Sequence, residues 1–346
     1  MQMTCKYLEN QTCIRSDGQY RLCCLSMEPD NKENIRTHTP EEWHNSETLI
    51  KAKQLLADGV FPEACAKCQK LEEAGLESQR LKPRLYGPGL SHLDLRFGNS
   101  CNLKCISCFP MSSSSIAQEA NDMEAAGIDP MWGTLKPANV NWASDENFDK
   151  ILDLPIQEVY MTGGEPMMVK GIEKFLERLD PKTTVRFNTN CTIWNPKLEK
   201  ILRRFDTVVM SFSLDAVDEK IEYIRYGTKW KEAEENAKRY ADFCFVNLSP
   251  TISILNAWFY DDIKEYCDKK NWRIFENILY FPHWLNVKHA PDSLKTQFQG
   301  IKKEWLDGGD PKQIEIFKKQ ITLLDNWRGV KIGDYLPPVA KAYGLD

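Results

Sequence analysis

Three cysteines stand close together at a point where they could hold one metal centre. The segment GNSCNLKCISC follows the apolar stretch LDLRF and places Cys101, Cys105 and Cys108 in a CxxxCxxC pattern. Three thiolates on one short loop can bind one face of a four-iron cubane and leave the fourth iron without a protein ligand. Zinc is the alternative, but zinc sites normally use four ligands in two pairs. We therefore expect an iron–sulfur cluster with one open iron at this loop.

A second candidate site precedes this loop. Nine of the 12 cysteines lie in the first 108 residues, and six of these nine come before the loop. Cys13 and Cys23 flank a glycine, and Cys65 and Cys68 form a CAKC pair, so these four thiols are the candidate ligands. Thiolates bind both zinc and iron–sulfur clusters, so a structural zinc site is the alternative. Cys24 could replace Cys23 as a ligand, and we expect Cys5 to be free.

Composition and charge narrow the class of protein. The first residues, MQMTCKYLENQTC, contain no apolar core and no small-residue cleavage site, so we expect no signal peptide and a cytoplasmic location. In a reducing compartment, so many cysteines favour metal ligands over disulfides. The net charge of −5 predicts no nucleic-acid partner, and we expect no membrane span. We interpret the three isolated cysteines as small buried apolar side chains; they are Cys191, Cys244 and Cys267.

Short apolar strands alternate with amphipathic helices from Ser91 onward. The expected strands are 93–97, 158–162, 184–188, 207–214, one near 246–254 and one near 274–281; helical patterns include GIEKFLERL, KWKEAEENAKRYADF and QIEIFKKQITLLDNW. Strands separated by helices imply right-handed crossovers and a parallel sheet. Six such units predict an α/β fold, a partial (β/α)6 parallel barrel. Its functional residues are expected at the carboxyl ends of the strands.

Four segments are expected along the chain. Residues 1–78 form a small cysteine-rich domain with helical spacing from Pro40 to Asp58, and residues 79–90 form a linker punctuated by Pro83, Gly87 and Pro88. Residues 91–291 form the barrel, and helices in 292–346 close it.

The cysteine loop resembles the signature of the radical S-adenosylmethionine (radical SAM) superfamily. That resemblance implies a [4Fe–4S] cluster whose open iron chelates the methionine amine and carboxylate of S-adenosylmethionine. MTGGEPM, after the second strand, is similar to the GGE motif of the family. By this correspondence Gly163 and Gly164 let the backbone approach the methionine moiety, and Glu165 accepts its ammonium group.

Two further segments carry the resemblance. SFSLDAVDEKIEYIRYG is similar to the SLDG…R segment, which implies that Ser213 contacts the ribose or carboxylate and that Arg225 pairs with the carboxylate; a surface arginine on a helix is the alternative. NTNC is similar to the TNG segment, which implies ribose or substrate contacts for Asn188 and Asn190; a simple strand-end turn is the alternative. The family's aromatic residue before the third cysteine is replaced by Ser107, and Phe109 is a candidate substitute for its adenine contact.

The N-terminal cysteines resemble those of SPASM and twitch domains, through a Gly-x4-Cys element ending at Cys23 and a Cys-x2-Cys element ending at Cys68. This resemblance implies one auxiliary [4Fe–4S] cluster, two clusters in all. In the familiar enzymes such a domain follows the barrel, whereas here it would precede it.

The implied function is reductive cleavage of S-adenosylmethionine to a 5′-deoxyadenosyl radical, which takes hydrogen from a peptide or protein side chain or from a small metabolite. An electron donor such as flavodoxin or ferredoxin is implied as a partner. The alternative is an iron–sulfur or zinc electron carrier, or an assembly module, without radical chemistry. GGEP and the segment from Ser213 to Arg225 speak against this alternative, because a carrier needs no cofactor-binding loops.

Overall fold

The computed structural model describes residues 3–26, 32–82, 89–132 and 140–346. The chain forms two compact units: Met1–Cys101, Pro137–Asn188 and Asn195–Val209 make up unit 1, and Asn102–Lys136, Thr189–Trp194 and Met210–Asp346 make up unit 2. The predicted linker partly falls outside the described residues, at 83–88. Among the described residues, no helix has the length and apolar character needed to cross a membrane.

Unit 1 is built on a largely parallel sheet. Its strands lie in the order β2 (Tyr20–Arg21), β1 (Gln11–Ile14), β3 (His92–Arg96), β5 (Glu158–Thr162) and β6 (Thr184–Thr189), with the start of β7 (Val208–Phe212) beside β6. β1, β3, β5 and β6 are parallel, with Cys13 opposite Asp94 and Leu95 opposite Met161, whereas β2 is antiparallel. The prediction of a parallel α/β sheet is confirmed, and closure into a partial barrel stays a prediction.

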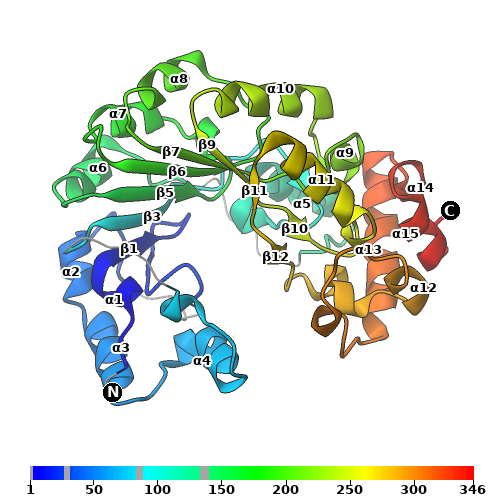
Figure 1. Ribbon diagram of the computed structural model, residues 1–346, viewed down its shortest axis with the longest axis horizontal. Helices are drawn as coiled ribbons and strands as arrows, with labels where there is room; N and C mark the ends of the chain where they lie inside the picture. The colour runs from blue at the N-terminus through cyan, green and yellow to red at the C-terminus, as the bar shows by residue number, and fades with distance from the viewer. Residues whose placement is uncertain (1–2, 27–31, 83–88, 133–139) are drawn as a thin grey trace. The chain divides into compact units, whose positions relative to one another are not determined.

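Helices α6 (Asp145–Leu152), α7 (Ile172–Glu177) and α8 (Pro196–Leu202) lie together along one side of these strands (Figure 1). Ser144 and Asn195 cap the first and last of these helices by accepting backbone N–H groups. Apolar residues alternate along β5 and β6, so one strand face packs against the helices. Three aromatic rings, of Phe97, Phe148 and Phe175, fill this core with centroids 5.1–5.8 Å apart.

The N-terminal residues join this sheet through β1 rather than forming a sheet of their own. Their helices are α1 (Lys6–Asn10), α2 (Pro40–His44), α3 (Glu47–Ala57) and α4 (Ala66–Glu73), with short 3-10 turns at Glu63–Cys65 and Gln79–Leu81. The helix expected over 40–58 is interrupted, because Ser46 accepts the Leu49 N–H and starts α3 anew. The boundaries of a separate N-terminal domain stay a prediction.

Unit 2 contains the end of β7 and the strands that follow it. β9 (Phe245–Leu248) pairs in parallel with β11 (Arg273–Ile274), β10 (Thr251–Ile252) pairs in parallel with β12 (Asn277–Ile278), and β4 (Lys104–Cys105) pairs antiparallel with β8 (Arg225–Tyr226). Its α-helices are α5 (Ser114–Ala125), α9 (Lys220–Ile224), α10 (Trp230–Ala241), α11 (Tyr260–Lys270), α12 (Asp292–Lys295), α13 (Lys312–Arg328), α14 (Ile332–Tyr335) and α15 (Pro337–Tyr343). Its short 3-10 turns are at Pro110–Ser112, Ala257–Phe259, His283–Leu285, Val287–His289 and Lys303–Trp305.

A buried ion pair fixes α13 against α5 within unit 2. Arg328 donates to both carboxylate oxygens of Glu119, at 3.0 and 2.7 Å. Lys104 Nζ lies 3.5 Å from the same carboxylate. Lys104 belongs to the cysteine loop, so two helices whose paired residues are 209 positions apart in the sequence help to hold that loop in place.

Candidate metal and cofactor sites

The GGEP turn of unit 1 lies directly against the backbone that leads into the cysteine loop. Gly163 and Gly164 both have positive φ, 76° and 49°. A Cβ on Gly164 would stand 2.3 Å from the carbonyl oxygen of Ser100, and the Glu165 N–H donates to that oxygen at 2.7 Å. Only glycine fits this approach. The turn is therefore locked to the residue that precedes Cys101.

Glu165 has the burial and charge expected of a binding group. It is 1% exposed, and its Oε1 accepts the backbone N–H of Met167 at 3.1 Å. This bond caps the 3-10 turn Pro166–Met168 (η4) and fixes the side chain beside the two glycines. A carboxylate held in a low-dielectric turn binds an ammonium group through strong, charge-assisted hydrogen bonds.

The rest of the cysteine loop belongs to unit 2. Cys105 is buried in β4, and the Cys108 N–H donates to the Cys105 carbonyl at 3.1 Å. The Ile106 N–H also donates to the Ile224 carbonyl at 3.0 Å. Burial raises the pKa of the Cys105 thiol, and the charge of Arg225 partly offsets this rise. The loop thus has a fixed backbone and a thiol whose ionisation depends on a nearby cation.

Arg225 contacts a buried carboxylate and one cysteine of the loop. Its Nε lies 2.8 Å from Oδ2 of Asp215, and its Nη1 lies 3.9 Å from Sγ of Cys105. Burial lowers the pKa of Arg225, and the adjacent Asp215 carboxylate more than offsets this, so the pKa stands above its usual range. The side chain is only 12% exposed, so the alternative of a surface arginine is wrong. Sequence reasoning missed Asp215, whose ten-residue separation from Arg225 follows no helical spacing.

The remaining predicted cofactor residues stand at strand ends. Asn188 is half-buried on β6 in unit 1. In unit 2, Asn190 donates from Nδ2 to Oδ1 of Asn102 at 3.1 Å, which ties the strand end to the cysteine loop. The Ser213 N–H donates to the Thr189 carbonyl at 2.8 Å. Contacts of Asn188, Asn190 and Ser213 with a cofactor stay predictions.

Two aromatic residues flank the third cysteine in unit 2. Phe109, the candidate substitute for an adenine contact, is 40% exposed. Trp132 donates from Nε1 to the Cys108 carbonyl at 3.1 Å. Sequence reasoning missed Trp132, because nothing in the local pattern links it to a loop 24 residues away.

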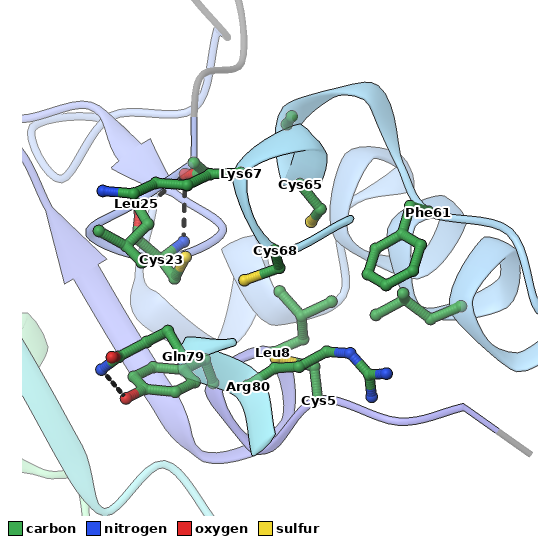
Figure 2. A pocket seen from close by; sticks show the side chains of 14 residues that line it. Cys5, Leu8, Cys23, Leu25, Phe61, Cys65, Lys67, Cys68, Gln79 and Arg80 are labelled. Atoms are coloured by element: carbon green, nitrogen blue, oxygen red, sulfur yellow. Dashed lines mark hydrogen bonds between the residues drawn. The ribbon is translucent and has the colours of Figure 1, made fainter. Parts of the chain in front are cut away.

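The N-terminal cysteines line a hollow of about 440 Å³, including its open mouth (Figure 2). Its cysteines are Cys5, Cys23, Cys65 and Cys68. Three of the four expected ligands are thus brought together, whereas Cys13 lies on β1 and is not part of the lining. Among the described residues, no three His, Cys, Asp or Glu side chains are grouped closely enough to hold a single metal ion. Cys191 and Cys267 are buried, as predicted, and Cys244 is half-buried.

Comparison with known families decides the class of the protein. A family model described as the radical SAM superfamily matches residues 95–269, half of the chain. The chain belongs to the radical SAM superfamily. The matched span contains all three cysteines of the CxxxCxxC loop, the GGEP turn and Arg225.

Several solved structures are similar to this one. "Native anSMEcpe with bound AdoMet" has a TM-score of 0.43 and 16% identity, over 69% of this chain and 62% of that chain. SuiB from Streptococcus suis, bound to S-adenosylmethionine, has a TM-score of 0.38 and 14% identity, over 89% of this chain and 57% of that chain. The chain therefore spans about three fifths of the length of these proteins. No curated protein matches it.

This radical SAM chain has the residues that its cofactors, a [4Fe–4S] cluster and S-adenosylmethionine, require. Three thiols on one loop provide the soft ligands that an iron–sulfur cluster needs. The space that a Cβ at Gly164 would fill is taken by the backbone of Ser100, so the turn carrying Glu165 is held beside the start of that loop. The residues present therefore fit both the [4Fe–4S] cluster and S-adenosylmethionine.

Proposed function

We propose that this protein is a radical SAM enzyme that removes a hydrogen atom from a peptide or protein side chain. When bound, the cluster and S-adenosylmethionine supply the chemistry, in which one electron cleaves the sulfonium to methionine and a 5′-deoxyadenosyl radical that abstracts hydrogen. The observation that carries the proposal is the GGEP turn. Its Glu165 N–H donates a hydrogen bond to the carbonyl of Ser100, the residue before Cys101. A simple electron carrier has no need of such a turn.

Each residue has a distinct task in this proposal. Cys101, Cys105 and Cys108 hold the cluster, and Glu165 binds the ammonium group of the methionine moiety. Arg225 is a positioning residue, since its contacts with Asp215 and Cys105 fix the loop. Its pairing with the cofactor carboxylate stays a prediction.

A peptide substrate is favoured by aromatic side chains at strand ends in unit 2. Phe275 follows β11, and Tyr280 and Phe281 follow β12; their exposed fractions are 49%, 67% and 62%. Exposed aromatic rings suit a peptide because they bury large areas with little loss of side-chain freedom. SuiB, one of the similar structures, was solved with its precursor peptide SuiA. A small metabolite is the alternative substrate, and flavodoxin or ferredoxin the proposed electron donor.

Uncoupled cofactor cleavage tests the proposal. Anaerobically reconstituted protein, given dithionite and S-adenosylmethionine, should slowly form 5′-deoxyadenosine without any substrate, as measured by chromatography. Replacing Cys101, Cys105 and Cys108 by Ala should abolish the product, whereas Cys65→Ala with Cys68→Ala should leave some of it. If intact, iron-loaded protein forms no 5′-deoxyadenosine with several reductants, the electron-carrier alternative is favoured instead.

A further inference from the structure

We propose that Cys5, Cys23, Cys65 and Cys68 are the four ligands of a second [4Fe–4S] cluster, and that Cys13 is not a ligand. This inference rests on the proposed function and deepens it, because it assigns the auxiliary centre to specific side chains. It also reverses two expectations, since Cys5 was expected to be free and Cys13 to bind metal.

The four cysteines come from three separate segments that meet at one hollow. Cys5 immediately precedes α1, Cys23 lies on the loop after β2, and Cys65 and Cys68 stand at the start of α4. Figure 2 shows their sulfur atoms around a common space, with Leu8 and Phe61 among the apolar side chains nearby. A site assembled from distant segments in this way is typical of a metal centre that ties a small region together.

The surroundings of Cys13 differ from those of this group. Cys13 is 1% exposed in the middle of β1, where it is paired in register with Asp94 of β3. It is therefore held by the sheet beside an acidic group, outside the lining of the hollow.

Cations and backbone contacts around the hollow suit an anionic centre. Arg80 and Lys67 both line it, and Arg80 also donates to the Thr4 carbonyl at 3.1 Å, next to Cys5. With all four irons bound to protein thiolates, no iron of this centre would be open to S-adenosylmethionine or substrate.

Iron analysis of full-length variants tests the ligand set without relying on SAM cleavage. The parent carries Ala at positions 101, 105 and 108, so that only the second centre binds iron, and it should hold about four irons and four sulfides per chain. Adding Cys5→Ala should lower the iron content to three or fewer, with loss or conversion of the [4Fe–4S] Mössbauer signal. Adding Cys13→Ala or Cys24→Ala, the matched controls, should leave about four irons.

Several results would overturn the assignment. Iron retained in Cys5→Ala and lost in Cys13→Ala would place Cys13 in the ligand set, and loss in Cys24→Ala would do the same for Cys24. One zinc per parent chain without sulfide would identify a zinc site. If Cys5→Ala does not fold, Cys5→Ser takes its place in the test. An oxygen ligand should shift the Mössbauer and electron paramagnetic resonance spectra of an intact cluster. Unchanged spectra would exclude Cys5 from the ligand set. None of these outcomes depends on whether the complete enzyme cleaves S-adenosylmethionine.

Discussion

The guanidinium of Arg225 is bound to the carboxylate of Asp215, with Nε 2.8 Å from Oδ2 and Nη2 3.1 Å from Oδ1. Oδ1 of Asp215 also accepts the Thr251 N–H at 2.7 Å, and Nδ2 of Asn256 donates to the Asp215 carbonyl at 3.0 Å. This ion pair therefore connects β8 to the segments after β7 and β9. Because Arg225 also contacts Sγ of Cys105, the position of a cluster-binding thiol depends on the same pair.

Replacing Arg225 by Ala should destabilise the protein and lower its iron content. The change leaves the Asp215 carboxylate, 1% exposed, without its charged partner, which costs about 3–5 kcal/mol. Arg225→Lys should recover only part of this stability, because the single ammonium nitrogen of lysine cannot lie beside both carboxylate oxygens of Asp215 as the planar guanidinium does. Anaerobic urea unfolding and iron analysis measure both effects.

Lys269→Ala is the matched control for this experiment. Lys269 forms an ion pair with Glu265 on the surface of α11, so its loss should change stability by less than about 1 kcal/mol. If Arg225→Ala unfolds at the same urea concentration as the control, the buried pair does not support the loop.

Gly164→Ala should disrupt the GGEP turn. The added Cβ would meet the Ser100 carbonyl at 2.3 Å, so the turn must move away from the cysteine loop. We expect at least a tenfold loss of S-adenosylmethionine affinity in equilibrium dialysis. Gly59→Ala is the control, because Gly59 also has a positive φ but has no atom within 4 Å of its Cβ position. Equal affinity in the two variants would mean that the close approach is not needed for binding.

The regular elements could be predicted from sequence better than the contacts between them. The strand at 158–162 occurs where the sequence predicts it, because apolar residues alternate there and turn residues follow. The partner of Arg225 could not be predicted, because it depends on how the loop after β7 folds back. Cys5 and Cys13 are also indistinguishable by residue type. Only the pairing of β1 with β3 shows that Cys13 is held in the sheet, away from the hollow.

His44 should make the N-terminal region sensitive to mild acid. Burial lowers the pKa of His44 to about 4, and its Nε2 lies 3.0 Å from the Gln11 carbonyl. Because the pKa is about 6.5 in the unfolded chain, the unfolded state binds more protons between these values. The stabilisation is fully present above pH 6.5 and is lost as the pH falls toward 4. The free energy of urea unfolding should be lower at pH 5.5 than at pH 8, and this difference should be smaller in His44→Gln. Equal differences in the two proteins would exclude His44 as the cause.

The last prediction concerns the charge of Glu165. Glu165→Gln keeps the size and the oxygen that can accept the Met167 N–H, so the turn should fold normally and iron content should stay near that of the unaltered protein. The substitution removes the negative charge proposed to bind the ammonium group of S-adenosylmethionine. A charge-assisted hydrogen bond contributes about 1.5–3 kcal/mol, so affinity should fall roughly 10- to 100-fold in equilibrium titration. Glu177→Gln, at the exposed end of α7 in the same unit, should leave affinity unchanged. Unchanged affinity in Glu165→Gln would mean that this carboxylate serves only to cap its turn, and an equal loss in both variants would point to a general effect of charge rather than to a specific contact.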